Sequence, residues 1–449
     1  IMNTVFIILA AGKGTRMQSD LPKVLNKLGG KPLAQHLLDT VEDIKGSRTH
    51  LVVGHQPELV KETLNTSNKT HFVLQKNQLG TAHAVKQSLK NLRTNSISLV
   101  LYGDGPLVKK QTLTKLIESA KKGNLSILTY KPENPFGLGR IVRGKGGLVE
   151  KIVEEKDTSI EEKRINEVNS GILAIKTKHL KNLIVKISNK NAAKEYYLTD
   201  MVELANKFNI PVKATVVSDH QQVLGVNTAQ ELHDLERQYQ KDLARQLISK
   251  GARIADTSRI DVRGSLSIGM GSFVDINAVF EGNNKIGKNV SIGPNCYLKD
   301  SVLGDDVKVL ANTVIEDSIV GKGCSLGPFS RIRGGTEMET GSELGNFVEA
   351  NRSQIGPSSK AKHLAYLGDA ELGRKVNIGA GTITCNYDGK KKHKTKMEDE
   401  VFIGSNSSLV APVTLKKGSY TGAGSVITKN VKAGELAIGR ARQKNLRKK

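Results

Sequence analysis

Two different hydrophobic patterns divide this chain of 449 residues. From residue 1 to about 225, short apolar runs alternate with segments in which apolar residues recur at helical spacing. The runs predict strands at 4–10, 51–53, 72–74, 98–102 and 126–130, and the spacing predicts helices over 33–44 and 82–92. Alternating strands and helices predict a doubly wound, mostly parallel α/β sheet, in which ligands bind at the carboxyl ends of the strands.

Residues 228–250 carry one apolar stripe with charged residues opposite it, which predicts a single long helix. Thr228 is a plausible N-cap, and Gly251 is a plausible stop. We interpret this helix as a rigid connector between two unlike regions.

After about residue 252, an aliphatic residue recurs every sixth position and is often followed by glycine, as in Ile268-Gly269, Ile286-Gly287 and Ile292-Gly293. This step is typical of hexapeptide β-helices, in which stacked coils bury a common core. A β-sandwich would instead need a two-residue alternation. The predicted fold class is therefore α/β plus all-β: a Rossmann-like domain at 1–227, a connector helix at 228–250 and a parallel β-helix at 251–449.

Charge and composition narrow the classes of function. The formal net charge of +24 fits nucleic acid, an anionic membrane or small anionic substrates. Lysines are spread along the chain, with dense clusters only at 390–394 and 447–449, and aromatic residues make up 4% without any tryptophan. Few bases could stack on such a surface, so we favour local phosphate sites and expect no nucleic-acid partner.

Cysteine content and hydropathy predict the compartment. Cys296, Cys324 and Cys385 are an odd number without metal-ligand spacing, which favours a reducing environment. No apolar run reaches the roughly 18 residues that span a bilayer, and the first residues do not resemble a secretion signal. We therefore expect a cytoplasmic protein without membrane insertion.

The apolar run Val5 to Leu9 opens into a small, basic loop, Ala10-Ala11-Gly12-Lys13-Gly14-Thr15-Arg16. Such a loop presents backbone N–H groups to a phosphate. It is not a dinucleotide fingerprint, because Met17 stands where the third glycine would be, and it is not a Walker loop. A tight turn with exposed charge is the alternative. Lys23, in a following Leu-Pro-Lys segment, adds a cation and favours the loop of a sugar-phosphate nucleotidyltransferase.

Three further segments carry candidate chemistry. Asp104 follows a strand between two glycines, which suits a divalent metal, although in isolation a turn or helix-cap aspartate is the more common explanation. His363 is flanked by cations that favour its neutral form, as a general base requires, although a surface histidine is the alternative. The segment 377–389 is dense in Asn, Gly and Thr; it forms either a binding site or plain solenoid corners, and the lysine loop after it could meet phosphates.

Taken together, the chain resembles the bacterial bifunctional N-acetylglucosamine-1-phosphate uridyltransferase/glucosamine-1-phosphate acetyltransferase family over essentially its whole length. The motifs that carry the resemblance are 9–17, Gln75 with Gly80-Thr81, 102–104, 197–200, 363–369 and 377–389. The resemblance implies a left-handed β-helix, a homotrimer and the synthesis of UDP-N-acetylglucosamine, a precursor of peptidoglycan and lipopolysaccharide.

For the first reaction, the resemblance implies in-line attack of N-acetylglucosamine-1-phosphate on UTP, with release of pyrophosphate. Arg16 and Lys23 would neutralise the triphosphate, and Asp104 and Asn227 would hold Mg²⁺. The uridine and its phosphates would be bound by Leu9, Ala10, Ala11, Gly12, Lys23, Gln75, Gly80 and Thr81, and the sugar by Gly139, Glu154 and Asn169.

For the second reaction, the resemblance implies acetyl transfer from acetyl-CoA to glucosamine-1-phosphate in a site between subunits of the trimer. His363 would take a proton from the amine. The sugar phosphate would be bound by Arg333, Tyr366, Asn377 and the residue at position 351, which is Asn351 in this chain. The acetyl-CoA side would be formed by Ala380, Asn386 (near the amine), Tyr387, Ser405, Ala423 and Arg440.

The chain departs from the family pattern at three places. Asn351 stands where the family has a lysine for the sugar phosphate, and Arg352 beside it would have to reach in from the opposite face of a strand. Gly334-Gly335 replaces Pro-Gly, and Gly105 replaces an apolar residue and loosens the metal loop through backbone entropy. These departures leave open a second hypothesis, a uridyltransferase whose β-helix is a trimerising scaffold with a weakened acetyl site.

Overall fold

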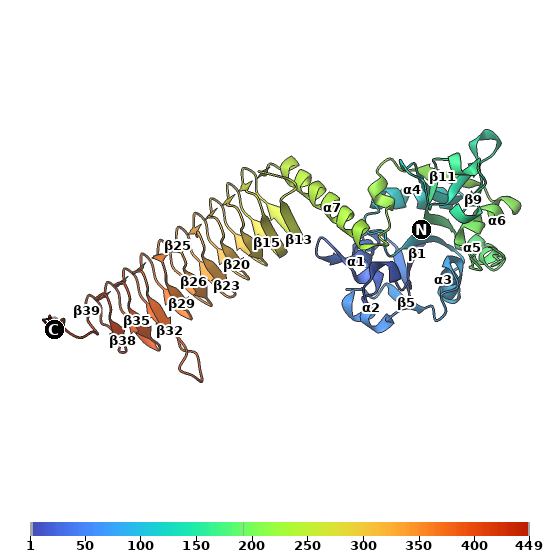
Figure 1. Cartoon of the computed structure of the whole chain (residues 1–449). Helices are drawn as coiled ribbons and strands as arrows, with labels where there is room; N and C mark the ends of the chain where they lie inside the picture. Colours follow the sequence, from blue (N-terminus) through green and yellow to red (C-terminus); the bar gives the residue numbers. More distant parts are fainter. Residues whose placement is uncertain (1–2, 192, 448–449) are drawn as a thin grey trace. The chain divides into compact units, whose positions relative to one another are not determined.

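The computed structural model describes residues 3–191 and 193–447, and the chain forms two compact units, residues 1–235 and 236–449. Figure 1 shows a mixed α/β unit in blue to green and a coiled unit of short strands in yellow to red. Among the helices of the described residues, none has the length and apolarity needed to cross a membrane.

A mixed sheet runs through the N-terminal unit. In spatial order its main strands are β5 (Thr70–Leu74), β4 (Ser47–Val53), β1 (Asn3–Ala10), β6 (Ser96–Tyr102), β10 (Val168–Lys176), β7 (Leu125–Tyr130) and β11 (Val212–Val216). β10 is antiparallel to both of its neighbours, and the other adjacent pairs are parallel. The hairpin β8 (Arg140–Arg143) and β9 (Val149–Val153) attaches to β10, and β2 (Lys27–Leu28) pairs with β3 (Lys31–Pro32).

Helices cover both faces of this sheet, as alternation along β1 shows. Val5 and Ile7 enter one core, with α3 (Thr81–Ser88), α5 (Thr177–Ile184) and α6 (Met201–Lys207). Phe6 and Ile8 enter the other core, with α1 (Leu33–Glu42), α2 (Pro57–Thr63) and α4 (Lys110–Lys121). A central strand that is buried on both faces reads as a continuous apolar run, which is why the sequence predicted it. The doubly wound prediction is confirmed.

Helix α7 (Ala229–Ser249) begins with a reciprocal capping box. The Glu231 N–H donates to Thr228 Oγ1, and the Thr228 N–H donates to Glu231 Oε2, both at 3.1 Å. Further along the helix, the buried Gln240 amide donates to Val262 O and accepts from the Val262 N–H, both at 2.8 Å. Gln240 therefore satisfies the backbone of β13 (Ile260–Ile268), the first strand of its sheet, as a covered sheet edge requires.

The C-terminal unit is a parallel β-helix, as the six-residue step predicted. Successive coils stack in register: Lys308 pairs with Ser325, Ser325 with Glu343, and Glu343 with Lys360. The aliphatic position after each, such as Val309, Leu326 or Leu344, is buried in one continuous core.

Two sheets form the walls of this solenoid. One contains β12 (Arg253–Ile254), β14 (Phe273–Val274), β16 (Ser291–Ile292), β19 (Lys308–Val309), β22 (Ser325–Leu326), β25 (Glu343–Asn346), β28 (Lys360–His363), β31 (Asn377–Ile378), β34 (Phe402–Ile403), β37 (Tyr420–Thr421) and β39 (Leu436–Ala437). The other contains β13, β15 (Ala278–Ile286), β17 (Tyr297–Lys299), β18 (Val302–Leu303), β20 (Val314–Glu316), β21 (Ile319–Val320), β23 (Arg331–Arg333), β24 (Glu337–Met338), β26 (Glu349–Asn351), β27 (Gln354–Ile355), β29 (Tyr366–Gly368), β30 (Ala370–Leu372), β32 (Ile383–Cys385), β33 (Thr395–Met397), β35 (Ser408–Val410), β36 (Val413–Leu415) and β38 (Val426–Ile427).

One loop interrupts the stacking between β32 and β33. It contains the predicted lysine cluster and is closed by a bridge between Tyr387 and Lys392. Asp388 holds it in shape, because its carboxylate accepts from the N–H groups of Lys390 and Lys391, each at 2.7 Å. The loop projects from the solenoid in Figure 1.

Candidate active sites

The loop after β1 packs closely against the segment that carries Lys23. Gly14 has a φ of 65°, and a Cβ at this residue would lie 2.7 Å from the Cβ of Lys23. Only glycine combines this backbone conformation with such a close approach. Below the loop, the Gly103 N–H donates to Leu9 O at 2.9 Å. The ends of the central strands β1 and β6 therefore lie side by side, where α/β sheets bind their ligands.

Four of the predicted residues meet above these strand ends. Lys23 Nζ forms an ion pair with the Asp104 carboxylate and also donates to Asn227 Oδ1 at 3.1 Å. Arg16 Nη2 donates to the same Asn227 oxygen at 3.0 Å. The Val226 N–H donates to Asp104 O at 2.9 Å and fixes the distant segment beside β6. The fold thus gathers two cations, a carboxylate and an amide from three separate segments.

An oxygen of Asp104 and an oxygen of Asn227 both contact the Lys23 ammonium. The two oxygens thus meet at a position that suits a positive charge, as the ligands of a metal ion do. Within the described residues, no group of three or more His, Cys, Asp or Glu side chains gathers as a complete metal cage. Mg²⁺ is commonly held by one or two carboxylates together with substrate phosphates. This donor pair therefore fits a Mg²⁺ ion that also binds a phosphate.

A pocket of about 300 Å³ opens beside this polar cluster. The predicted residues that line it are Leu9, Ala10, Ala11, Gly12, Lys23, Gln75, Gly80, Thr81 and Asp104. The sequence analysis did not single out Gln78, whose amide donates to Ala11 O and ties the β5–α3 connection to the glycine-rich loop. Its position between Gln75 and Gly80 is a signal that could have identified it.

A second pocket, of about 430 Å³, shares Tyr102 and Asp104 with the first and is lined by Asn169 and Asn227. The Asn169 N–H donates to Gly139 O at 2.9 Å. A Cβ at Gly139 would lie 3.5 Å from the Glu154 carboxylate, so the three predicted sugar residues adjoin one another.

Acidic groups near the second pocket hold their protons more firmly than usual. Burial raises the pKa of Glu154, and a hydrogen bond from Thr199 Oγ1 at 3.0 Å opposes this rise. Burial, together with Glu203 and Glu154, raises the pKa of Asp200 to about 6. Burial is the largest cause of the raised pKa for both carboxyl groups, so each binds a proton more tightly than a free side chain does.

The structure also reveals an ion pair that the sequence analysis missed. Arg140 is 2% exposed, and its Nη2 lies 2.8 Å from Glu155 Oε2. Glu155 also accepts from the Gly137 N–H at 3.1 Å, and Arg140 donates to Leu138 O. The pair clamps the turn 137–139, which contains the predicted sugar residue Gly139.

On the solenoid, most of the predicted sugar-phosphate residues share one wall. Arg333, Asn351 and Gly368 stack in register on β23, β26 and β29. Arg333 Nη1 donates to Glu349 Oε1 at 2.9 Å. A Cβ at Gly368 would lie 2.5 Å from the Tyr366 hydroxyl and 2.7 Å from the amide nitrogen of Asn386, so only glycine leaves room for both groups.

Arg352 is turned away from Asn351 by the corner on which it lies. It has a φ of 48°, and its guanidinium forms two hydrogen bonds to the Asp369 carboxylate, at 2.8 and 2.9 Å. Asn386 Nδ2 donates to the same carboxylate at 2.5 Å. These contacts with Arg352 and Asn386 lower the pKa of Asp369 despite its partial burial. The Arg352 cation is thus already paired at the corner.

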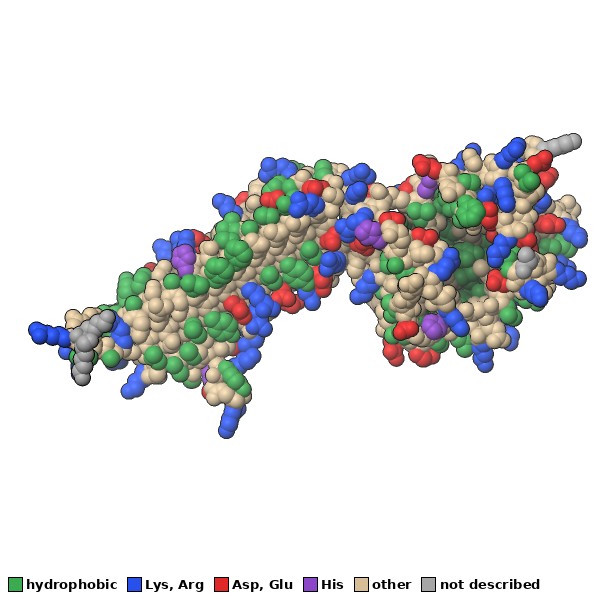
Figure 2. All heavy atoms as spheres, viewed as in Figure 1, with side chains coloured by type: hydrophobic (Ala, Val, Ile, Leu, Met, Phe, Trp, Pro, Cys, Tyr) green, Lys and Arg blue, Asp and Glu red, His purple; other side chains and the backbone are tan. Residues whose placement is uncertain are grey.

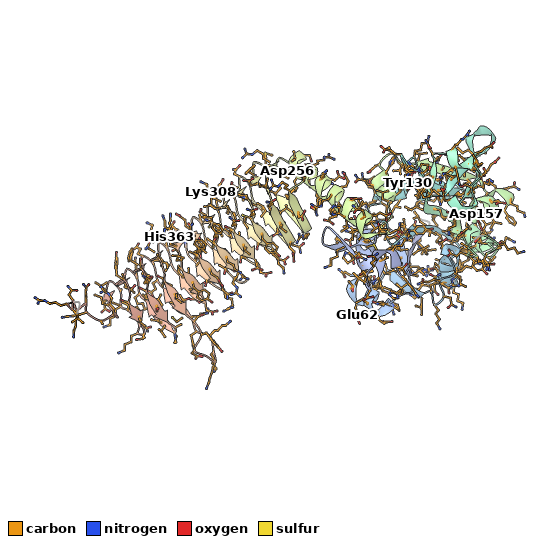
Figure 3. The ribbon with its side chains drawn as sticks, viewed as in Figure 1. Glu62, Tyr130, Asp157, Asp256, Lys308 and His363 are labelled. Carbon is orange, nitrogen blue, oxygen red and sulfur yellow. The ribbon has the colours of Figure 1, made fainter. Side chains whose placement is uncertain are left out.

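His363 ends β28 in the other sheet and is exposed, at the edge of the solenoid where Figure 3 labels it. The lysines before it are compensated: Lys360 and Lys362 both pair with Glu343, at 3.2 and 2.6 Å. Asn377 lies in the same wall, paired with Lys360. Within one chain, His363 and Asn377 therefore occupy a different wall from Arg333 and Tyr366.

The predicted acetyl-CoA residues follow one corner of successive coils. The Asn406 N–H donates to Ala380 O, and the Gly424 N–H donates to Ser405 O, both at 2.7 Å. Ala423 precedes Gly424, and a Cβ at Gly424 would lie 3.8 Å from Arg440 Cδ. Tyr387 lies at the base of the lysine loop, 60% exposed, and its hydroxyl donates to Gly389 O at 2.7 Å.

Family models match both units. A MobA-like NTP transferase domain matches residues 6–194, a GMPPB C-terminal domain matches 262–366, and a hexapeptide repeat of succinyl-transferase matches 394–429. Among curated relatives, the bifunctional protein GlmU of Marinobacter nauticus is 47% identical over 98% of this chain and 97% of its own length. The same protein of Idiomarina loihiensis is 47% identical over 98% and 96%, and that of Pseudomonas putida is 45% identical over 99% and 97%.

Proposed function

The chain belongs to the family of bifunctional GlmU proteins, and from this premise we propose how its residues carry out two transfers that yield UDP-N-acetylglucosamine. The N-terminal unit is the nucleotidyltransferase, and the hexapeptide solenoid is the acetyltransferase. The family predicted from the sequence is confirmed.

In the first reaction, a phosphate oxygen of N-acetylglucosamine-1-phosphate attacks the α-phosphorus of UTP. A new P–O bond forms as the bond to the β-phosphate breaks, and pyrophosphate leaves with the electron pair. This chemistry needs positioning and charge neutralisation rather than a protein nucleophile. Arg16 and Lys23 neutralise the triphosphate, while Gly139, Glu154 and Asn169 hold the sugar. Asp104 and Asn227 hold Mg²⁺, which when bound neutralises the phosphate charge.

The observation that carries this proposal is the meeting of Arg16, Lys23, Asp104 and Asn227 beside a pocket lined by the glycine-rich loop. Replacing Lys23 with alanine should lower kcat/KM for UTP about 10²–10³-fold, because one electrostatic donor to the reacting phosphate is lost. Lys61→Ala, which removes an exposed lysine paired with Glu58, is the matched control. Equal rates for both variants would contradict the assignment.

In the second reaction, His363 takes a proton from the ammonium group of glucosamine-1-phosphate, because only the neutral amine attacks a thioester. The amine nitrogen bonds to the acetyl carbon, and the C–S bond breaks with its electron pair on sulfur. The second amine proton passes to this thiolate, and CoA leaves as the thiol. Arg333 binds the sugar phosphate, and Tyr366 and Asn377 place the sugar. The corner formed by Ala380, Ser405, Ala423 and Arg440 binds the cofactor.

The placement of these groups on two walls of one solenoid supports a site shared between copies, and we propose the homotrimer that the resemblance implies. Neighbouring copies would bring His363 of one chain to Arg333 of another. An exposed apolar row supports such packing: Phe329 and Phe347 stack with ring centroids 5.3 Å apart, and Leu364 is 62% exposed. Apolar side chains are visible along the solenoid in Figure 2.

Mixing inactive chains tests the shared site. His363→Ala and Arg333→Ala proteins are each expected to lack acetyl transfer. Equimolar co-refolded mixtures should recover about a quarter of the wild-type rate, because about a quarter of randomly assembled sites contain both native residues. Recovery in a mixture together with a trimeric mass in sedimentation supports the proposal. A monomer with full acetyl transfer would contradict it.

A second candidate is favoured by Asn351, which lacks the charge for a phosphate, and by Arg352, which is paired with Asp369. It is a uridyltransferase with a weakened acetyl site. Acetyl transfer at saturating glucosamine-1-phosphate separates the two: a rate no higher than that of His363→Ala would leave only the second candidate.

We further propose a cytoplasmic location, which suits a protein whose three cysteines are unpaired.

A further inference from the structure

The segment that leads into helix α7 is held by a carboxylate from within the helix. Glu231 lies in the first turn of α7, and its Oε2 accepts from the Asn227 N–H at 2.6 Å and from the Thr228 N–H at 3.1 Å. These two N–H groups belong to the peptide units on either side of Asn227. Because each peptide unit is planar, holding both of them restrains the φ and ψ of Asn227.

The capping box at this helix explains only part of the arrangement. In a capping box, the N-cap residue and the third helical residue exchange hydrogen bonds, as Thr228 and Glu231 do at 3.1 Å. The contact with Asn227 lies one residue outside the box and, at 2.6 Å, is the shortest of the three. The carboxylate therefore does more than start the helix, because it also holds the residue before the cap.

The backbone on the other side of Asn227 is fixed by the sheet. Val226 is 1% exposed, and its N–H donates to Asp104 O at 2.9 Å. With its backbone held on both sides, Asn227 has a restrained Cα–Cβ direction. Its Oδ1 reaches the charged cluster, where it accepts from Arg16 at 3.0 Å and from Lys23 at 3.1 Å.

We infer that Glu231 is a positioning residue for the metal site, which holds the backbone of Asn227 so that the amide oxygen can bind Mg²⁺ together with Asp104. Since Oε2 of Glu231 is engaged by two N–H groups, it acts through Asn227. The inference rests on the proposed uridyl transfer and deepens it. Partners that orient a metal ligand commonly change metal affinity about 10–100-fold, and Glu231 is exposed, so we expect an effect of roughly tenfold.

The test separates this role from helix capping in the full-length protein. Glu231→Ala removes the acceptor from both Asn227 and the cap. Thr228→Ala removes the cap oxygen but leaves the contact between Glu231 and the Asn227 N–H, so it is the matched control: both variants weaken the start of the same helix. Glu231→Gln keeps an oxygen that can accept the same hydrogen bonds, as glutamine does in capping boxes.

Two of the measurements do not depend on turnover. Binding of Mn²⁺, a paramagnetic substitute for Mg²⁺, is measured by electron paramagnetic resonance with a UTP analogue whose α and β phosphorus atoms are joined by an uncleavable methylene group. Hydrogen exchange of residues 225–228 is measured in the metal-free protein. Uridyl transfer at saturating Mg²⁺ gives kcat and the KM of each substrate.

Glu231→Ala should raise the dissociation constant of Mn²⁺ roughly tenfold and speed exchange of the Asn227 amide, while Thr228→Ala and Glu231→Gln stay within about twofold of the wild-type constant. At saturating Mg²⁺, the KM for the sugar phosphate should not change. The inference is overturned if Glu231→Ala binds Mn²⁺ as the wild type does. It is also overturned if Thr228→Ala or Glu231→Gln weakens binding equally, since capping or charge would then explain the loss. Absence of uridyl transfer in the wild-type protein would instead contradict the proposed function.

Discussion

Replacing Asn351 with lysine should strengthen acetyl transfer by supplying a missing cation. Asn351 is 7% exposed and lies between Arg333 and Gly368 in the register of the solenoid wall. The Tyr366 hydroxyl and the Asn386 amide fill the space over Gly368, so a lysine stem at position 351 must extend past these groups to carry its ammonium to the surface. Arg352 cannot take this role while it is paired with Asp369.

The size of the effect follows from the type of hydrogen bond. A neutral amide donor contributes about 0.5–1.5 kcal/mol to binding, and a charge-assisted bond to phosphate contributes roughly twice that. The gain of about 1 kcal/mol corresponds to a roughly fivefold lower KM for glucosamine-1-phosphate. Repulsion from Arg333 is small, because Arg333 is paired with Glu349 and 41% of its side chain is exposed, where water screens charge.

The assay measures both reactions in the same protein. Acetyl transfer is followed against glucosamine-1-phosphate concentration, and uridyl transfer serves as the internal control because it uses the other unit. Asn351→Gln, a lengthened but neutral side chain, is the matched variant. The reasoning is refuted if Asn351→Lys leaves the KM unchanged, or if Asn351→Gln lowers it equally, since charge would then not be the missing element.

Three further predictions concern the N-terminal unit. Gly105 lacks a positive φ and its Cβ would lie 3.7 Å from the nearest atoms, so Gly105→Ala should stabilise the protein by about 0.5 kcal/mol in urea unfolding, with unchanged uridyl transfer. Glu155→Gln leaves the Arg140 guanidinium buried and unpaired, so we expect a loss of about 3 kcal/mol in unfolding and a raised KM for the sugar phosphate, but not for UTP. Burial lowers the pKa of His50 to about 4, so the unfolded chain takes up a proton first and stability falls as pH drops from about 6.5 toward 4. Between pH 7.5 and pH 5, His50→Leu should therefore lose up to about 2 kcal/mol less unfolding free energy than the wild-type protein. Unfolding at each pH is followed by the circular dichroism of the helices, and an equal loss in both proteins would disprove the prediction.

The fold was largely predictable because its hydrophobic patterns are regular. The apolar run of β1 lies in two cores at once, and the six-residue step places residues such as Val309 and Leu326 in one core. Each pattern is local, so reading it needs no knowledge of distant contacts. The residues that meet at the first site were named in advance from short motifs at strand ends, a placement that the α/β fold imposes.

Other features could not be read from the sequence because they depend on contacts between distant segments. Gln78 and Glu155 belong to no periodic pattern, and only folding brings them to Ala11 O and Arg140. Gln75 comes within 3.0 Å of His83 only because the next helix begins beside the end of β5. A side chain's partner is set by the geometry of the connection, which spacing does not record.

By itself, the sequence determined the two units, the glycine-rich loop, the hexapeptide core and the family, because burial period and backbone freedom are properties of neighbouring residues. Only the tertiary structure decided where the charges go. Arg352 stood beside the missing lysine in the sequence and could have replaced it. The corner of the solenoid places it at a φ of 48°, where its guanidinium pairs with Asp369 on the next coil. The direction of a side chain at a corner is fixed by the stacking of coils, and that stacking exists only in the folded chain.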